Sequence, residues 1–538
     1  MNKSNIMNLI SDPWLPVQDK AGTCHTIKLS EIGGHRDAHF VEIKAPRADF
    51  KGAIYQLLIG ILQTAFAPKD SREWKKYWRT PPSQEELEQA FKRIETAFNL
   101  NTTNGTPAFM QDFDLPKGED KNIAALLIEA PGGKTITDNA DHFIKRGGVE
   151  NLSPYWAAIA LFTLQINAPS GGVGHRVSLR GGGPLTTLVL PPENSTQNTL
   201  WHQLWLNVLT EEEMLEQHGN NDLGGLPATF PWMTDTRTSE KKGMETYPED
   251  AHPLQMYWSM PRRIRLHWDE SNDGVCGLSG QQSTHLLHSF HAKNYGVNYT
   301  GNWVHSLTPY SLEAGNEPLS IKGQPGGLGY RHWLGLAVSD ESGKAKKVPA
   351  TVVQNYLKTR CHWIGDKSLN PRLWAFGYDM DNMKARCWYE ANMPIFNLEG
   401  EALADLHDYA QAMVQAAVDV LKTLKSALKI AWFKRPKDAK GDLSAIDANF
   451  WSATESEFYR LLAQLAELAE KDDEDSAKKL LISWANRLKQ SARELFDQYA
   501  LSSMNEDGDF KRVIKAKHGK GGLEHYLNGS KALKALAA

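Results

Sequence analysis

The pattern of apolar residues changes near residue 397, and this change limits how the chain can fold. After Pro394, apolar side chains recur at steps of three and four residues, which places them on one face of a helix. Before it, short apolar runs alternate with glycine, proline and polar segments, as in mixed strands, helices and loops. A chain of 538 residues exceeds what one hydrophobic core usually supports. The sequence therefore predicts an α+β domain over residues 1–397 and a helical domain over residues 398–538.

The helical domain is predicted to be a four-helix bundle. Its first helix begins near Leu398, where the periodic pattern starts. Residues 454–457 (Thr-Glu-Ser-Glu) have the form of a capping box and predict the start of a second helix, which extends to about Ala469. Further helices are predicted over 477–499 and 510–536, the last one broken by glycines. Four antiparallel helices with short connections form a bundle.

In the first part of the chain, two segments are apolar on more than one face. Residues 50–66 and 151–166 are therefore predicted to be buried core helices. The second leads into a glycine-rich stretch, residues 168–184, with glycine clusters on either side of Arg176 and Arg180. Glycine has no Cβ atom, so this stretch can bring backbone groups and arginine charge close to a polyanion. Taken alone, the pattern fits two tight turns around a short strand better than a phosphate or nucleic-acid site.

The charge balance restricts how the chain could bind nucleic acid. The formal net charge is −4, so any contact with phosphates must come from local basic patches or be shared with partner subunits. One candidate patch is the strand-like segment 256–268, where Arg263 and Arg265 alternate with apolar residues. The pattern fits a solvent-facing strand and a phosphate-facing strand equally well.

Motifs for enzymatic chemistry and for metal binding are weak. Residues 131–135 (Pro-Gly-Gly-Lys-Thr) look like a phosphate loop, but Ile128 stands where a Walker motif requires glycine. The four cysteines form no Cys-x-x-Cys pair. Three histidines near Cys276 lack the spacing of a zinc motif; they are His285, His288 and His291. We therefore predict a protein that is not an enzyme and has no metal or other cofactor.

The sequence also predicts a cytoplasmic location. No apolar stretch is long enough to span a bilayer. Residues 1–13 lack the apolar core of a signal peptide.

Residues 100–152 are predicted to be mostly irregular, with a long loop that mixes aromatic and basic side chains. The loop contains Asn139, Phe143 and Lys145. Long loops inside compact domains tend to be functional or disordered. Aromatic and basic side chains together favour a contact with nucleic acid or with a partner protein.

Four short blocks carry a family resemblance. They are residues 12–17 (Asp-Pro-Trp-Leu-Pro-Val), 107–111 (Pro-Ala-Phe-Met-Gln), 168–172 (Ala-Pro-Ser-Gly-Gly) and 179–187 (Leu-Arg-Gly-Gly-Gly-Pro-Leu-Thr-Thr). In this order they resemble the CasA family, the large subunit of the type I-E CRISPR surveillance complex Cascade. The last block is the most specific, and the resemblance covers most of the chain. It implies an irregular α+β domain followed by a four-helix bundle.

The resemblance implies a non-catalytic recognition subunit that works with crRNA and the other Cascade subunits. In the family, a glycine loop lies in the minor groove of the target double-stranded DNA, at the protospacer-adjacent motif. Here that loop consists of Ser170, Gly171, Gly172, Val173 and Gly174. Small residues suit the narrow minor groove, whose code is degenerate. The family subunit also recruits the helicase-nuclease that degrades the target, and no membrane contact is implied.

Two further DNA contacts follow from the resemblance. A lysine finger falls at Lys293 or Asn294, of which only Lys293 carries a charge. A wedge loop that starts strand separation falls at four residues, Asp381, Asn382, Met383 and Lys384. The family's wedge glutamine is absent, so Asn382 or the apolar Met383 would take its place, and methionine is able to unstack bases.

The resemblance also assigns the long loop a role as a docking loop at the 5′ end of the crRNA assembly. Its candidate contacts are Asn139, Phe143 and Lys145, the last in place of a family asparagine. The cysteine cluster of some relatives is reduced here to Cys276, which argues further against zinc.

Two alternatives stay open at the level of the sequence. A nucleotide-binding enzyme would use the glycine-rich loop for phosphates. A purely structural scaffold would use a tryptophan-rich surface, built from some of the 17 tryptophans, to hold other subunits together.

Overall fold

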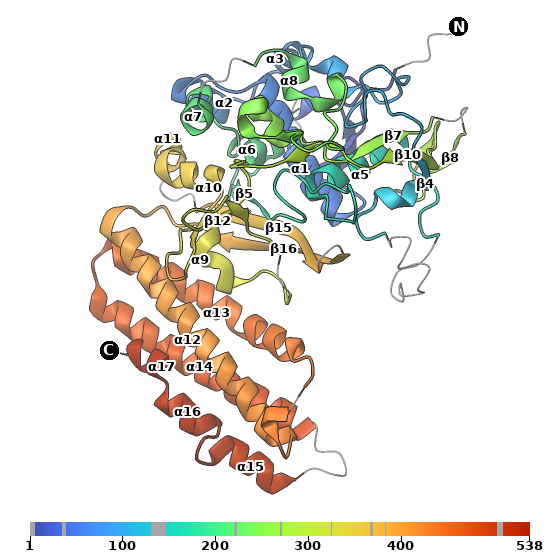
Figure 1. Cartoon of the computed structure of the whole chain (residues 1–538). Helices are drawn as coiled ribbons and strands as arrows, with labels where there is room; N and C mark the ends of the chain where they lie inside the picture. Colours follow the sequence, from blue (N-terminus) through green and yellow to red (C-terminus); the bar gives the residue numbers. More distant parts are fainter. Residues whose placement is uncertain are drawn as a thin grey trace. The chain divides into compact units, whose positions relative to one another are not determined.

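The computed structural model (Figure 1) divides into two compact units, which are described separately below. The first unit comprises residues 1–323 and 343–389, and the second comprises residues 324–342 and 390–538. The structure describes all residues except 1–5, 35–38, 131–146, 220–222, 269–271, 324, 366–369, 382–383, 439, 503–508 and 538. Within the described ranges, no helix combines the length and the apolar character needed to cross a membrane.

Two buried helices form the centre of the first unit. They are α1 (Ala48–Ala65) and α5 (Pro154–Asn167), which pack against each other, with the rings of Phe50 and Trp156 stacked at 6.2 Å between centroids. Both are apolar on most faces, so they are stable only inside a core. The prediction of two buried core helices is thus confirmed. The first unit also contains shorter helices: α2 (Ser71–Arg79), α3 (Gln84–Phe91), α6 (Leu200–Trp205), α7 (Glu211–His218), α8 (Leu226–Thr229), α10 (Thr351–Asn355) and α11 (Cys361–Ile364).

The strands of the first unit form several small sheets. One has the order β2-β1-β3, another β4-β10-β7 and a third β16-β15-β5. Their strands are β1 (Leu15–Asp19), β2 (Cys24–Ile27), β3 (Phe40–Ile43), β4 (Glu119–Asn122), β5 (Thr186–Leu190), β7 (Arg263–Leu266), β10 (Ser289–Lys293), β15 (Arg372–Asp381) and β16 (Lys384–Pro394). Residues 390–394 of β16 are assigned to the second unit. Shorter pairings involve β6 (Glu245–Thr246) with β11 (Asn298–Tyr299), β8 (Gly274–Val275) with β9 (Gln282–Ser283), and β12 (Tyr310–Leu312) with β13 (Leu319–Ser320) and β14 (Lys346–Val348).

The residues on either side of the predicted wedge lie in two long strands, because 376–381 form the end of β15 and 384–386 form the start of β16. Phe376 and Tyr378, two residues apart, point to the same face of β15. Both rings contact Trp388 of β16, at 5.5 and 4.9 Å between centroids. This aromatic packing helps to hold the two strands together.

Three long helices dominate the second unit and lie side by side in Figure 1. They are α12 (Gly400–Trp432), α13 (Ser444–Glu470) and α14 (Glu474–Ser502). The fourth position is filled by three short helices that pack along α12, namely α15 (Phe510–His518), α16 (Leu523–Gly529) and α17 (Lys531–Ala535). The predicted fold class, an irregular α+β part followed by a helical bundle, is confirmed.

The predicted start of the second bundle helix is wrong. Thr454 lies in the middle of α13, fully buried, and its Oγ1 donates to the carbonyl of Phe450. The apolar spacing that includes Ile446 and Phe450 extends the helix upstream to Ser444. A Thr-x-x-Glu pattern within a run of periodic apolar residues therefore does not mark the start of a helix here.

The second unit also contains the short segment 324–342, which includes α9 (Trp333–Leu336). Tyr330 of this segment stacks on Phe458 at 4.3 Å between ring centroids, and its hydroxyl shares a hydrogen bond with Thr454 Oγ1 at 2.9 Å. The segment thereby belongs to the core of the bundle, although it precedes the sequence-based boundary at residue 397.

Most of the tryptophans lie in the cores, and the others are half-buried, namely Trp268, Trp363, Trp388, Trp432 and Trp451. None of the 17, all of which the structure describes, is exposed. Seven are among the largest fully buried side chains: Trp74, Trp201, Trp205, Trp232, Trp258, Trp333 and Trp484. The tryptophans therefore contribute mainly to the cores, and this weighs against the scaffold alternative, which needs a tryptophan-rich surface.

Candidate nucleic-acid interface

The glycine-rich stretch folds back on itself directly after α5. Its base is closed by backbone hydrogen bonds from Ser178 N to Ala168 O at 3.1 Å and from Gly183 N to Asn167 O at 3.1 Å. The side chain of Arg262, next to β7, adds a further bond by donating from Nη2 to the carbonyl of Pro169. The residues between these bonds form a loop. Its base is held by Asn167 at the end of α5 and by Arg262, which precedes β7.

The tip of this loop is exposed. Ser170, Gly171, Gly172 and Val173 are exposed to solvent, and the Val173 side chain reaches 79%. Gly172 has a φ of +98° and Gly174 a φ of +76°, backbone conformations that favour glycine. The tip therefore presents backbone groups, the small polar side chain of Ser170 and the apolar side chain of Val173 to a ligand.

The end of β10 holds the other side of the loop. Asn294 donates from Nδ2 to the carbonyl of Val173 at 2.9 Å, and Tyr295 N donates to the carbonyl of Gly174 at 2.8 Å. A Cβ atom at Gly174 would lie 2.9 Å from the Cβ of Asn294 and 3.1 Å from the Tyr295 ring. Only glycine permits this approach, so the predicted glycine loop and the predicted lysine finger adjoin.

Lys293 and Asn294, the two candidates for the finger, have different surroundings. Asn294 is bound to the loop, whereas Lys293 ends β10 with a side chain that is 38% exposed. The Lys293 Nζ lies 3.8 Å from Glu240 Oε1, and this carboxylate is itself 48% exposed. A pair of this kind is weak because both groups remain hydrated. Lys293 can thus turn its charge toward a phosphate.

Arg176 connects the loop to a neighbouring segment. Its guanidinium donates from Nε to Ser239 Oγ at 2.8 Å and from Nη2 to Ser239 O at 3.0 Å, and it lies over the Tyr295 ring at 5.8 Å. Ser239 in turn donates from Oγ to the carbonyl of Gly296 at 2.7 Å. Arg176 therefore stabilises the junction between the loop and the end of β10.

Arg180 does not face a ligand in the way that the less favoured interpretation of the glycine-rich stretch would require. It is 5% exposed and donates to Gln56 Oε1 at 2.8 Å and to the hydroxyls of Thr186 and Thr308, both at 3.0 Å. Burial lowers its pKa to about 10, so it remains charged at neutral pH. Arg180 is a structural residue that ties the second half of the glycine-rich stretch to α1.

The alternating arginines of β7 are also structural. Arg263 donates from Nε to Asp112 Oδ2 at 2.6 Å. Arg265 donates to the backbone carbonyls of Thr102, Thr103, Thr106 and Asp112. Both side chains are buried, so neither the solvent-facing nor the phosphate-facing interpretation of this strand is correct.

The second glycine cluster contacts the strand that leads to the predicted wedge. Gly183 has a φ of +62°, and a Cβ atom there would lie 2.3 Å from the Cγ of Met380 in β15. The Gly-Gly-Gly-Pro run at residues 181–184 is a signal of close backbone approach, but its partner Met380 is distant along the chain. Of the wedge residues, Lys384 is exposed, whereas Asn382, Met383 and the side chain of Asp381 lie outside the description.

The docking-loop candidates Asn139, Phe143 and Lys145 lie outside the described residues as well. The histidines and the cysteine considered for zinc do not meet among the residues described. His288 Nδ1 lies 3.2 Å from the carbonyl oxygen of Glu150, and the Cys276 sulfur accepts a hydrogen bond from Ser153 N at 3.4 Å.

Comparisons with known proteins agree on one family. The sequence profile of the family described as CRISPR-associated protein Cse1 matches residues 8–495. The fold is similar to that of CasA from Thermus thermophilus, with 18% identity, 99% of each chain covered and a TM-score of 0.67. It is also similar to Cse1 from Acidimicrobium ferrooxidans, with 17% identity, 100% of each chain covered and a TM-score of 0.67. A chain of a structure titled "CRISPR RNA-guided surveillance complex" matches at 13% identity over 92% of this chain and 99% of that chain, with a TM-score of 0.59.

Proposed function

The chain belongs to the family of the CRISPR-associated protein Cse1, also called CasA, and we propose that it is the non-catalytic large subunit of a type I-E Cascade complex. In this proposal it acts with crRNA and the other subunits. It recognises the protospacer-adjacent motif in target double-stranded DNA, starts strand separation, and recruits the helicase-nuclease. The motif is contacted from the minor groove by the loop Ser170–Gly174.

The observation that carries this proposal is the direct bonding between the loop and the end of β10. Asn294 and Tyr295 fix the carbonyls of Val173 and Gly174 at 2.9 and 2.8 Å. Two segments more than a hundred residues apart in the sequence therefore form one surface, with an uncharged tip next to the cation of Lys293.

This surface suits a minor groove for steric and electrostatic reasons. The groove of B-DNA is only about 6 Å wide and offers few distinguishing donors and acceptors. A tip of glycines and one valine is narrow enough to enter it, and Lys293 can contact a phosphate at its rim. Recognition through backbone groups would tolerate several related motifs.

The strands β15 and β16 support the second part of the proposal. β15 ends at Asp381 and β16 begins at the exposed Lys384, the first and the last of the four proposed wedge residues. Met383 is an apolar side chain that could enter a base step, and Asn382 could bond to an exposed base. In the same proposal, Asn139, Phe143 and Lys145 form the docking loop at the 5′ end of the crRNA assembly.

The experiment compares two charge variants of the loop tip in the reconstituted Cascade complex. Val173 is 79% exposed, so Val173→Glu and Val173→Lys should both fold. Val173→Glu places a carboxylate against the phosphates and is expected to weaken binding of a motif-bearing duplex about tenfold or more. Val173→Lys should bind at least as tightly as the unmodified complex. The readout is the dissociation constant at fixed salt.

A matched control places the same substitution elsewhere on the first unit. Val275 of β8 is 50% exposed and lies outside the proposed surface, so Val275→Glu should leave the affinity unchanged. If the Val173→Glu complex binds with the same affinity as the unmodified complex, the proposed role of the loop is contradicted.

The two alternative functions make different predictions. A structural scaffold predicts that the assembled complex binds duplexes with and without the motif equally well. A nucleotide-binding enzyme predicts that the isolated chain binds ATP or NAD in calorimetry.

A further inference from the structure

The sheet β4-β10-β7 brings together three side chains that the proposed DNA-binding surface does not use. In the pairing register, Asp120 of β4 is directly opposite His291 of β10. His267, which follows β7, pairs with Ser289 through a backbone hydrogen bond from His267 N to Ser289 O at 3.2 Å. Residues opposite one another, or two apart along a strand, share a face. Asp120, His267 and His291 therefore lie on the same face of this sheet.

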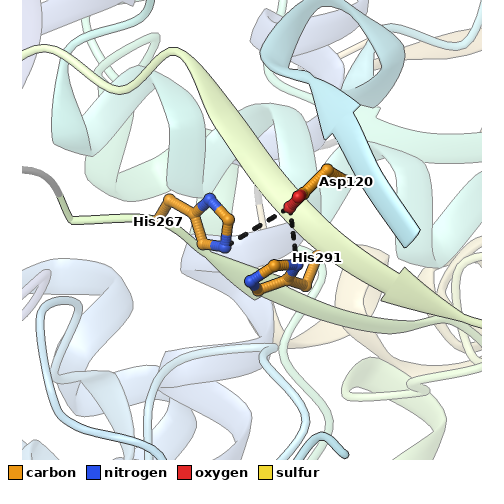
Figure 2. Close-up of side chains that lie close together, drawn as sticks. All are labelled: Asp120, His267 and His291. Carbon is orange, nitrogen blue, oxygen red and sulfur yellow. Dashed lines mark ion pairs between the residues drawn. The ribbon is translucent and has the colours of Figure 1, made fainter. Parts of the chain in front are cut away.

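Their polar atoms converge on one point (Figure 2). His291 Nδ1 lies 2.7 Å from Asp120 Oδ1, and His267 Nε2 lies 3.8 Å from the same oxygen. One ligand atom from each residue lies within 4.8 Å of the other two. Ligands bound to a tetrahedral zinc ion at about 2.0–2.2 Å are separated by similar distances. Small side-chain adjustments would suffice to place a cation among the three atoms.

Two details of the hydrogen bonding favour a bound cation over an ion pair among the three side chains alone. The Nδ1 atom of His267 lies 3.0 Å from Ser289 Oγ, and a bond there leaves Nε2 directed at Asp120. Support of one imidazole nitrogen in this way is the usual arrangement for a metal-ligating histidine. The Nδ1 atom of His291 is buried and, among the described residues, has no hydrogen-bond partner of acceptable geometry despite its short distance to Asp120.

We propose that Asp120, His267 and His291 bind one divalent transition-metal ion, with zinc as the preferred occupant. Two imidazole nitrogens and one carboxylate oxygen form a ligand set that suits this ion. Asp120 is 73% exposed, so the fourth position is open to water. Of the three histidines near Cys276 that the sequence analysis considered and judged not to bind zinc, only His291 belongs to this site.

The neighbouring charges are compatible with a cation at this place. Arg265 is opposite His291 in the register, but its guanidinium is held by the carbonyls of Thr102 and Asp112 among others. The carboxylate of Asp120 supplies the compensating negative charge. A bound ion would join the edge strand β4 to the residue that follows β7, and would hold β10 two residues before Lys293.

The test uses the full chain, stripped of metal by a chelator and then titrated with zinc. Calorimetry should show that the unmodified chain binds one more equivalent of zinc than Asp120→Asn does. Alternatively, the variant should bind this zinc with a dissociation constant at least about tenfold higher. Asp120 is exposed, so this variant should fold. Cobalt, used as a spectroscopic probe in place of zinc, should give visible absorption from nitrogen and oxygen ligands that is lost in His267→Gln.

The control is His288→Ala, which removes a nearby histidine outside the cluster and should leave zinc binding unchanged. Zinc should also raise the Tm of the unmodified chain but not that of Asp120→Asn. The proposal is overturned if Asp120→Asn binds as many equivalents as the unmodified chain with equal affinity. It is also overturned if the unmodified chain binds no zinc at micromolar concentration, since the three residues then form only an ion pair. Neither result depends on DNA binding.

Discussion

Lys293 and Asn294 are neighbours in the chain with separate tasks in the proposed interface. Asn294 uses its side-chain amide to bond the carbonyl of Val173, whereas Lys293 makes only a weak surface pair with Glu240. The sequence left open which of the two is the finger. The structure supports a division in which Asn294 positions the loop and Lys293 supplies the charge.

This division predicts a specific change in salt dependence. In the assembled complex, Lys293→Gln should weaken DNA binding and reduce the slope of log K against log salt by about one, because one phosphate contact is lost. Lys293→Arg should preserve the slope. The measurement is a salt titration of affinity for a motif-bearing duplex. An unchanged slope in Lys293→Gln would show that this lysine contacts no phosphate.

Single residues also show what the sequence could not reveal. Arg176, Arg180, Arg263 and Arg265 all looked like candidates for phosphate contacts, yet the last three are buried and bonded to the protein itself. Charge is visible in a sequence, but burial depends on partners such as Asp112 that are distant along the chain. The position of Asn294 against the loop was likewise visible only in three dimensions.

At the scale of elements, the glycine-rich stretch joins two parts of the first unit. Gly174 packs on the end of β10 and Gly183 packs on Met380 of β15. Both glycines have positive φ and neighbours within contact distance. The stretch can therefore be understood as a connection between the proposed groove contact and the strand that leads to the proposed wedge.

Substitution of Gly183 should test this connection. Gly183→Ala is expected to lower the free energy of unfolding by about 1–3 kcal/mol, from the left-handed backbone and from the clash with Met380. Gly105, with a φ of +79° and no atom within 4 Å, is the matched control, since Gly105→Ala carries only the backbone cost. Urea unfolding measures both.

The double variant Gly183→Ala with Met380→Ala separates the two contributions. If the Gly183 contact with Met380 is as described, adding Gly183→Ala to Met380→Ala should lower the free energy of unfolding only by as much as Gly105→Ala does in the unmodified chain. An equal loss in both backgrounds would mean that Met380 does not press on this glycine.

The elements that could be predicted were those with strong local signals. The periodic helices of the bundle and the two apolar helices α1 and α5 were evident because burial repeats every three or four residues. The strands β15 and β16 were not, since they depend on contacts such as that between Tyr378 and Trp388. The start of α13 was predicted too late because residues 454–457 have the pattern of a capping box. In the structure, Thr454 instead donates to the carbonyl of Phe450 within the helix.

At the scale of the whole molecule, buried histidines make stability sensitive to acid. Burial lowers the pKa of His202 to about 4, and that of His218 to about 4. Burial, together with the charge of Arg180, lowers the pKa of His305 well below its usual value. The unfolded chain therefore takes up protons near pH 6.5 that the folded chain does not.

The contribution of these buried histidines to the free energy of unfolding should accordingly be fully present above about pH 6.5. It should decrease as the pH falls from about 6.5 toward 4. Each such histidine contributes about 1.4 kcal/mol for each pH unit in that window. His202→Gln should reduce the slope of the unfolding free energy against pH by about one proton, whereas His525→Gln, at an exposed position of the second unit, should not. A slope unchanged by His202→Gln would show that this histidine becomes protonated in the folded chain.

The profile match shows the family of this chain, and the proposed function adds that the loop Ser170–Gly174 reads the motif from the minor groove. Base analogues test this proposed contact without altering the protein. Inosine in place of guanine removes only the minor-groove amino group, whereas 7-deazaguanine removes only a major-groove acceptor.

We predict that the assembled complex loses at least about tenfold in affinity when the minor-groove pattern of the motif is changed by inosine, or by 2,6-diaminopurine in place of adenine. It should bind duplexes containing the 7-deaza analogues as tightly as the natural duplex. The opposite result, insensitivity to the minor-groove analogues and a loss with the 7-deaza analogues, would contradict the account.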